Sequence, residues 1–211
     1  MKHLIIIGVG GFAREVYWHA QGSLGYGTEW DLKGFLDGDV KLEAEEYKKL
    51  ELPVLGDVNG YEIQEDDVFI CAIGKAAIRK KLVEIMLAKG AEFITIVHKT
   101  AIIHGNASIG KGVIISPFVR VHDHVQIGDF TIVNVVSGFG HDSFIGNFAD
   151  IMGGVGLDGC ACVEDEAFLA ESSILLPNAV VEKNAYVGAR SVVFKRVKAG
   201  TKVFGTPAMP I

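Results

Sequence analysis

The sequence predicts an α/β domain over residues 1–96, followed by a parallel β-helix over residues 97–211. Every sixth residue from Val97 to Val193 is aliphatic or aromatic. An α-helix has about 3.6 residues per turn, so this period would scatter the apolar residues around its axis, whereas short β segments joined by tight turns keep them on one side. Residues 1–96 lack the period and combine apolar runs, glycine turns and helical patterns.

The first domain is expected to begin with a strand, a glycine turn and a helix, all within the segment KHLIIIGVGGFAREVYWHA. The segments DLKGFLD and DDVFICAIG predict two more strands, and AAIRKKLVEIMLAKG predicts an amphipathic helix that Gly90 ends. A final strand, AEFITIV, is expected to lead into the repeat. Roughly 95 residues hold only half of a doubly wound fold, so the sequence predicts a Rossmann-like half domain and a mononucleotide ligand rather than NAD.

The glycine turn carries a nucleotide-binding pattern, Gly8-x-Gly10-x-x-Ala13, between the first strand and the first helix. Glycines there let a phosphate approach the backbone, and the helix N-terminus supplies N–H donors. Asp37 stands at the end of the next expected strand, where its carboxylate could bind a ribose hydroxyl. A tight strand–helix turn without a ligand is the other interpretation of the same residues.

The repeat has a second rule, which concerns the residue four positions after each apolar one. These residues are small or β-branched: Ala107, Val113, Val119, Val125, Thr131, Ser137, Ser143, Ala149, Val155, Ala161, Ala167, Ser173, Ala179, Ala185 and Ser191. Each β segment is therefore expected to point one bulky and one small residue inward, as the coils of a parallel β-helix require. Such coils stack by ladder hydrogen bonds about 4.8 Å apart.

Composition and charge argue against several classes of protein. The 211 residues are 49% hydrophobic, which suits a packed core, and the net charge of -6 argues against binding to nucleic acid. No apolar stretch approaches the roughly 20 residues that span a bilayer, and the apolar run at the start is too short for a signal peptide. The cysteines Cys71, Cys160 and Cys162 form neither an even disulfide set nor a CxxC pair, and they are expected to be small buried side chains. We therefore expect a cytoplasmic protein that does not insert into a membrane.

Several segments together resemble one family: IIIGVGGFAREV, GFLDGD, AIGKAAIRKKL, VNVVSGFGHDSFIG, VGARSVVFKRV and VFGTPAMPI. They are similar to the bacterial sugar acyltransferases with hexapeptide repeats, which include sialic acid O-acetyltransferases and N-acetyltransferases of UDP-linked 4-amino sugars. The resemblance covers nearly the whole chain. It implies a left-handed β-helix with eighteen residues in each triangular coil, whereas the general rule for β crossovers would give a right-handed one.

The resemblance also implies a homotrimer, with acetyl-CoA as co-substrate along the β-helix between neighbouring subunits and the acceptor's nucleotide in the N-terminal domain. The family's catalytic histidine falls on His141, its adjacent acidic residue on Asp142 and its oxyanion glycine on Gly159. The residues that match the family's acetyl-CoA contacts are Asp150, Gly159, Glu171, Gly188, Ala189 and Arg190. Those that match its acceptor contacts are Gly8, Gly10, Gly11, Asp37 and Asn134.

Two positions depart from the family's pattern. Relatives carry a second histidine nine residues after the first, where this chain has Asp150, so the contacts around the acetyl group can differ. The late repeat has Gly188-Ala189-Arg190 where a third small glycine is usual. Arg190 could reach a phosphate of CoA, or it could be a solvated surface charge.

Acetyl transfer to an amine or a hydroxyl needs a general base, because an ammonium group has no lone pair and a hydroxyl is a weak nucleophile. Histidine suits that role near neutral pH. A coil of eighteen residues puts His141 one coil from Asp123 and from Gly159, whose N–H could meet the oxyanion. Asp142 is expected to pair with His141, or with His124 in the neighbouring coil. A surface histidine at a coil corner is the competing interpretation of His141.

These features predict an acetyl-CoA-dependent acetyltransferase that acts on the amino group of a nucleotide-linked amino sugar. One alternative is O-acetylation of sialic acid or another free sugar. The run His122-Asp123-His124 also raises a zinc-dependent enzyme of the γ-carbonic anhydrase type, although the position five after His141 is Gly146 rather than histidine. A non-catalytic nucleotide-sensing scaffold is the last alternative. No metal is expected in the acetyltransferase.

Overall fold

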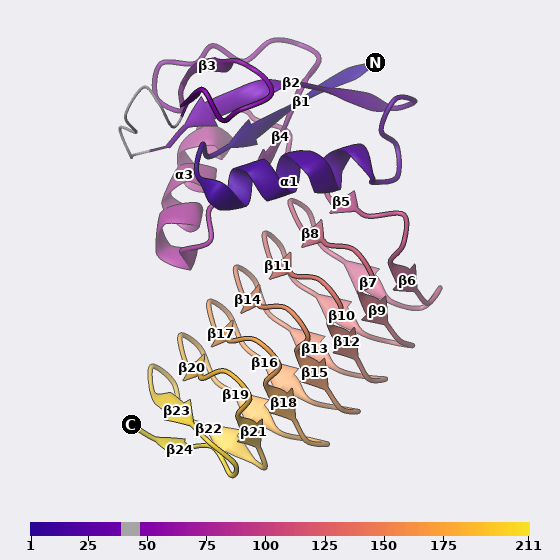
Figure 1. Ribbon diagram of the computed structural model, residues 1–211, viewed down its shortest axis with the longest axis vertical. Helices are drawn as coiled ribbons and strands as arrows, with labels where there is room; N and C mark the ends of the chain where they lie inside the picture. The colour runs from indigo at the N-terminus through magenta and orange to yellow at the C-terminus, as the bar shows by residue number, and fades with distance from the viewer. Residues whose placement is uncertain (39–46) are drawn as a thin grey trace. The chain divides into compact units, whose positions relative to one another are not determined.

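The computed structural model describes residues 1–38 and 47–211. The chain divides into two compact units, Met1–Val97 and His98–Ile211, and each is described by itself. Figure 1 shows the first as a layered α/β unit and the second as a stack of coils. Within the described parts of the chain, no helix is long and apolar enough to cross a membrane.

The first unit is built on a four-stranded parallel sheet in the order β3-β2-β1-β4. Its strands are β1 (Lys2–Ile7), β2 (Trp30–Asp37), β3 (Val54–Asp57) and β4 (Asp67–Cys71). The run Leu4 to Ile7 is fully buried, because a parallel sheet is covered on both faces. Parallel pairing brings the carboxyl ends of β1 and β2 to one edge, where Ile7 pairs with Leu36.

Helix α1 (Gly11–Gln21) connects β1 to β2, and helix α3 (Ala76–Ala88) follows β4. Each buries one face, as its amphipathic pattern predicts, with Val16 of α1 and Leu82 of α3 almost fully enclosed. Gly90, with a φ of 85°, follows the C-terminus of α3 and has the left-handed conformation that favours glycine.

Two details of the first unit differ from the sequence-based expectations. Strand β3 was missed because its residues VLGD carry little apolar alternation. The segment AEFITIV was expected to be one strand, yet it forms only an isolated bridge from Phe93 to Phe69 and the short β5 (Ile96–Val97). Its backbone follows β4 for one step, since the N–H of Ile94 donates to the carbonyl of Phe69, and then leaves the sheet.

The second unit is the predicted parallel β-helix, made of two-residue strands in three sheets (Figure 1). Sheet I contains β6 (Ile102–Ile103), β9 (Arg120–Val121), β12 (Gly138–Phe139), β15 (Gly156–Leu157), β18 (Ile174–Leu175) and β21 (Val192–Val193). Sheet II contains β7 (Ser108–Ile109), β10 (Gln126–Ile127), β13 (Phe144–Ile145), β16 (Cys162–Val163), β19 (Val180–Val181) and β22 (Arg196–Val197). Sheet III includes β8 (Ile114–Ile115), β11 (Ile132–Val133), β14 (Asp150–Ile151), β17 (Phe168–Leu169), β20 (Tyr186–Val187), β23 (Lys202–Phe204) and β24 (Met209–Pro210).

The coil repeats every eighteen residues, which the strand register confirms: Gly138 pairs with Arg120 on one side and with Gly156 on the other. The second residue of each strand points inward, so Phe139 and Ile145 are fully buried. Small polar residues also fit inside, because their hydroxyls reach backbone carbonyls. The Ser143 hydroxyl, for example, donates to the carbonyl of Gly140 at 2.8 Å.

Most corners of the β-helix turn through a residue with positive φ. The non-glycine residues in this conformation are Phe118, His124, Phe130, Val136, Asp142, Phe148, Cys160, Glu166, Ser172, Asn178, Asn184 and Arg190. Left-handed backbone is unusual for residues with a Cβ, and most of all for a β-branched one such as Val136. The corners therefore reorient neighbouring side chains in a way that a straight strand does not, and one of them forms the candidate site.

Candidate active site

His141 and Asp142 occupy the corner between β12 and β13. Asp142 has a φ of 58°, and this left-handed turn brings together two adjacent side chains that would point apart in a strand. Nδ1 of His141 lies 2.7 Å from Oδ2 of Asp142. Because an ionised carboxylate only accepts hydrogen bonds, Nδ1 carries the proton, and Nε2 of the neutral ring keeps its lone pair. Both side chains are well exposed, at 68% and 57%, so the pair faces outward from the corner.

Gly159 lies in the next coil, against the ring of His141. A Cβ built on Gly159 would lie 2.6 Å from Nε2 and 2.7 Å from Cε1 of that ring, closer than real Cβ contacts. The ladder continues through this corner, since the N–H of Cys160 donates to the carbonyl of His141 at 2.9 Å. Only glycine therefore fits beneath the imidazole.

The N–H of Gly159 has no acceptor among the described residues, although both flanking amides are used. The N–H of Asp158 donates to the carbonyl of Leu175, and that of Cys160 donates to His141. A backbone donor next to the imidazole is thus available to a ligand. Such a donor is the type of group that stabilises the oxyanion of acyl transfer.

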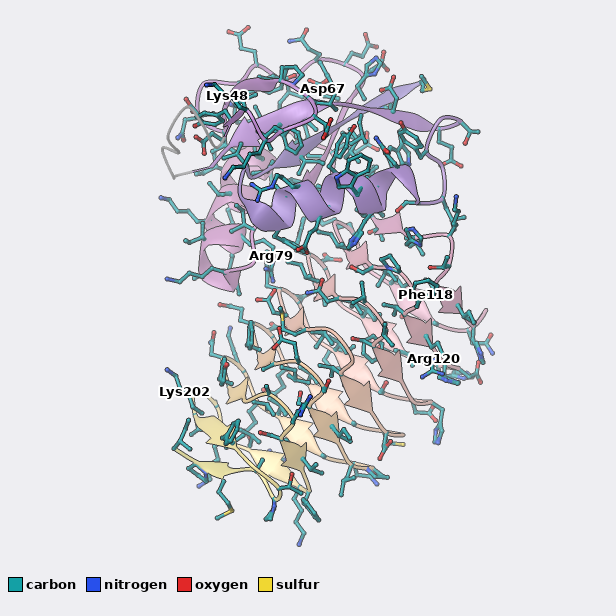
Figure 2. The ribbon with its side chains drawn as sticks, viewed as in Figure 1. Lys48, Asp67, Arg79, Phe118, Arg120 and Lys202 are labelled. Carbon is teal, nitrogen blue, oxygen red and sulfur yellow. The ribbon has the colours of Figure 1, made fainter. Side chains whose placement is uncertain are left out.

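A trough of about 300 Å³ lies on sheet I beside this pair and extends to Gly140 and Asp158 at the corner. Its floor is hollow because Gly138 and Gly156 take the outward positions of two successive strands. Arg120 takes the same position one coil earlier, and Figure 2 shows its side chain on the outside of the β-helix.

The guanidinium of Arg120 lies against Gly138, because a Cβ at that glycine would be 3.6 Å from Nη2. Among the described residues, no acceptor or carboxylate pairs with this guanidinium. The sequence analysis missed both Arg120 and the trough. The available signal was the spacing of Arg120, Gly138 and Gly156, three outward positions one coil apart.

Apart from Gly159, the residues predicted to contact acetyl-CoA lie away from the His141 corner. Glu171 and Ala189 stack on the corner between sheets III and I, where the N–H of Arg190 donates to the carbonyl of Glu171 at 2.9 Å. Gly188 directly follows β20 and leaves no room for a Cβ beside the ring of Phe204. Asp150 is buried, at 3% exposed, on β14 of sheet III.

Of the residues predicted to contact acetyl-CoA, Gly159 is therefore the one that lies beside His141 within a single chain. Asn134, predicted for the acceptor, also lies toward the sheet III to sheet I corner, and its Nδ2 is 3.6 Å from Sδ of Met152. The width of sheet I separates that corner from the His141 corner.

The run His122-Asp123-His124 does not gather its histidines around one point. Nδ1 of His124 lies 2.8 Å from Oδ2 of Asp123, so His124 pairs within its own corner rather than with Asp142. The ring of His122 instead packs against His104, with 5.0 Å between centroids. Hydrogen bonds from His124 and Asn106 hold the pKa of the Asp123 carboxyl below its usual range.

All three cysteines were expected to be buried, and Cys160 is exposed instead. Cys71 is buried, and burial raises the pKa of its thiol to about 12. Cys162 is half-buried, but Cys160 is exposed, because it holds the left-handed corner position and points away from the core. Across the described residues, the one group of three side chains with metal-ligand spacing is His141, Asp142 and Cys160.

The glycine turn of the first unit has the form that the motif predicts. Gly8 has a φ of 120°, and a Cβ there would lie 3.0 Å from the carbonyl oxygen of Ala72, so glycine is required. Gly10 is the N-cap of α1, makes no side-chain cap, and is followed by Gly11 at the first helical position. No acidic residue lies in the first turn of α1, so the positive end of the helix dipole is not neutralised there.

Asp37 ends β2 at the same edge of the sheet, since the N–H of Gly8 donates to the carbonyl of Leu36 at 2.8 Å. Oδ2 of Asp37 accepts a hydrogen bond of 2.6 Å from the hydroxyl of Tyr47. Its Oδ1 is buried and has no partner among the described residues. Asp39, the last residue of the segment GFLDGD, lies outside the described residues.

Comparison with known proteins identifies relatives over both units. The sequence model of the PglD N-terminal domain matches residues 3–86. The chain is 32% identical over 166 residues to GDP-perosamine N-acetyltransferase of Escherichia coli, covering 72% of this chain and 75% of that protein.

Solved structures give the same result for the fold. The acetyltransferase domain of PglB from Neisseria gonorrhoeae matches with a TM-score of 0.88 at 25% identity, over 100% of both chains. PerB from Caulobacter crescentus, solved with CoA and GDP-perosamine, matches with a TM-score of 0.89 at 24% identity, over 100% of this chain and 98% of that one. These matches confirm the left-handed form of the β-helix. The chain belongs to the bacterial sugar acyltransferase family with hexapeptide repeats.

Proposed function

We propose that the protein transfers the acetyl group of acetyl-CoA to the amino group of a nucleotide-linked amino sugar. The observation that carries the proposal is the stack of His141 on Gly159, with Asp142 bonded to the far side of the ring. Family membership supports the reaction class, and the GDP-perosamine N-acetyltransferase of Escherichia coli supports an amino sugar on a nucleoside diphosphate as acceptor.

In this mechanism His141 is the general base. Asp142 holds the proton on Nδ1, so Nε2 is the atom that takes a proton from the sugar amine. The amine nitrogen attacks the thioester carbonyl, the C–S bond of acetyl-CoA breaks, and the imidazolium returns its proton to the departing thiolate. The carboxylate of Asp142 stabilises that imidazolium while it exists.

The tetrahedral intermediate places negative charge on the former carbonyl oxygen. The N–H of Gly159 is the proposed donor, because it has no acceptor in the described part of the chain and adjoins the base. Loss of one oxyanion donor typically costs about 10²–10³ in rate. The bare Cα of Gly159 also lets a thioester approach the backbone, which a side chain would prevent.

The first unit is the proposed site for the acceptor's nucleotide. Amides of Gly10 and Gly11 in this turn and the uncompensated N-terminus of α1 suit a diphosphate. The carboxylate of Asp37, whose Oδ1 has no partner in the described part of the chain, suits a ribose hydroxyl at the adjacent strand end. In the second unit the trough beside His141, which Arg120 lines, is the proposed place for the sugar.

We also propose a cytoplasmic homotrimer in which a neighbouring chain completes each site. The matched acetyl-CoA residues Glu171, Ala189 and Arg190 lie on a different corner from His141, so a thioester bound there would reach the base of another copy. Exposed apolar side chains on the same side of the β-helix support self-association: Phe118 is 61% exposed and Val136 is 56% exposed.

The test incubates the purified chain with acetyl-CoA and GDP-, UDP- and dTDP-linked 4-amino sugars, alongside free sialic acid. The expected product is an acetamide on a nucleotide-linked sugar, detected by mass and stable to hydroxylamine. An ester that hydroxylamine cleaves, formed on a free sugar, would support O-acetylation instead. No transfer to any acceptor would overturn the proposal.

A further inference from the structure

Cys160 stands beside the proposed catalytic pair, although nothing in the acetyl-transfer mechanism uses it. It occupies the corner position one coil after Asp142, and its N–H donates to the carbonyl of His141. One ligand atom from each of His141, Asp142 and Cys160 lies within 4.8 Å of the others. All three residues are exposed, so an ion from solution can reach them.

This set has the chemistry of a site for a soft divalent cation. Imidazole nitrogen, thiolate sulfur and carboxylate oxygen are the three ligand types that bind zinc in proteins. Zinc lies about 2.0 to 2.3 Å from such ligands, so two donors on one tetrahedral ion are roughly 3.5 Å apart. Small rotations of exposed side chains would bring the observed cluster to that spacing, with water at the fourth position.

We propose that His141, Asp142 and Cys160 bind zinc or a similar soft divalent cation. The bound ion inhibits acetyl transfer because it coordinates the imidazole of His141, which then cannot act as the base. The effect does not depend on which ring nitrogen binds. An ion on Nε2 takes the lone pair that the mechanism needs. An ion on Nδ1 displaces the hydrogen bond to Asp142 and leaves the remaining ring proton on Nε2, which then cannot accept one.

The corner one coil earlier provides a matched comparison within the same chain. Asp123 and His124 form an equivalent pair at 2.8 Å, with side chains 49% and 62% exposed. That corner has no cysteine above or below it in the eighteen-residue register. The Asp123–His124 corner therefore gives the reference metal affinity of a histidine–carboxylate pair that has no thiolate ligand.

Binding is measured on the full chain with cadmium as the probe, in the absence of acetyl-CoA because CoA itself has a thiol. One cadmium ion per chain should give the ultraviolet absorption band of a cadmium–thiolate bond. Cys160→Ser should abolish this band and weaken zinc affinity in calorimetry by about 10-fold or more. Cys162→Ser should keep both, while Cys71 is buried and out of reach.

The inhibitory step rests on the proposed function and is tested separately. At free zinc about ten times its Kd, transfer by the wild type should fall roughly tenfold, since only the metal-free fraction is competent. Cys160→Ser should retain basal transfer and resist the same zinc concentration, and magnesium should inhibit neither protein. A cadmium band that survives in Cys160→Ser overturns the site. Full transfer with zinc bound overturns the inhibition, and an inactive chain that still binds cadmium through Cys160 would count against the proposed function alone.

Discussion

The imidazole of His141 lies on the Cα of Gly159, with no room for a methyl group between them. This relationship joins two residues eighteen positions apart in sequence, and the β-helix ladder fixes it through the bond from the Cys160 N–H to the His141 carbonyl. A base and a backbone donor are thereby held side by side by the fold itself.

Gly159→Ala should lower kcat by about 10² or more, because its Cβ would push the ring of His141 away and shield the backbone N–H. Gly105→Ala is the matched control. Gly105 holds the same corner position three coils earlier, and a Cβ there meets nothing within 4 Å. Steady-state kinetics and thermal melting of both variants check the prediction. Equal kcat values for the two would contradict it.

Asp142→Asn should lower kcat by at least about tenfold, and by no more than the roughly 10²–10⁴ that a general base contributes, because the imidazolium loses its negative partner. The hydrogen-bond distance of 2.7 Å can persist in the variant, so binding of CoA should change little. Asp123→Asn removes the same kind of carboxylate one coil earlier and should leave kcat unchanged. If both variants lose activity equally, the special role of Asp142 is wrong.

Arg120→Ala should raise the KM for the nucleotide sugar roughly tenfold while kcat changes little, since a charge-assisted hydrogen bond is worth about 1.5–3 kcal/mol. The reason is that its guanidinium faces the trough without a partner among the described residues. Arg196→Ala serves as control, because Arg196 is already paired with Glu182. An unchanged KM for the acceptor in Arg120→Ala would remove Arg120 from the site.

Asp67 anchors the sheet of the first unit, and its side chain is fully enclosed. Its oxygens accept hydrogen bonds from Lys33 at 2.6 Å, from the hydroxyl of Tyr61 at 2.8 Å and from the N–H of Gln64 at 2.8 Å. Removing one partner of a buried ion pair costs about 3–5 kcal/mol, so Asp67→Ala should lower the free energy of unfolding by about 3 kcal/mol. Urea unfolding measures this, and a loss below about 1 kcal/mol would contradict it.

The same network sets a pH dependence. Burial raises the pKa of the Asp67 carboxyl, but hydrogen bonds from Lys33, Gln64 and Tyr61 outweigh it and hold the pKa below its usual value. A carboxyl with a depressed folded pKa stabilises the fold above its unfolded pKa and loses that effect as the pH falls through the folded one. Wild type should therefore lose stability below about pH 4 more steeply than Asp67→Asn. If the stability of the wild type and of Asp67→Asn falls equally with pH, the hydrogen bonds to Asp67 do not cause the pH dependence.

The repeat made the second unit predictable in detail, because the period of six specifies the inward residues and the family resemblance supplies the eighteen-residue coil. That register alone put His141 beside Gly159. It could not choose the partner of Asp142, since that choice depends on the left-handed φ of Asp142, a property of the corner rather than of residue type. The exposure of Cys160 was missed for the same reason.

The trough and the short strands show a second limit of the sequence. Gly138 and Gly156 look like turn residues until the register reveals that they are outward neighbours on one sheet. In the first unit β3 was not predicted, and the strand predicted for AEFITIV was too long. Both errors arise because pairing at the edge of a sheet depends on which backbone lies nearby. The separation of His141 from Glu171 and Ala189, by contrast, follows from the eighteen-residue register, because neither residue lies a whole number of coils from His141.

The most direct test of the central claim is the turnover of His141→Ala with acetyl-CoA and a nucleotide-linked 4-amino sugar. The account predicts a loss of 10² or more in kcat, with the oligomeric state and CoA affinity unchanged. A kcat near that of the wild type would show that another group accepts the proton, and the role assigned to the His141–Gly159 stack would be wrong.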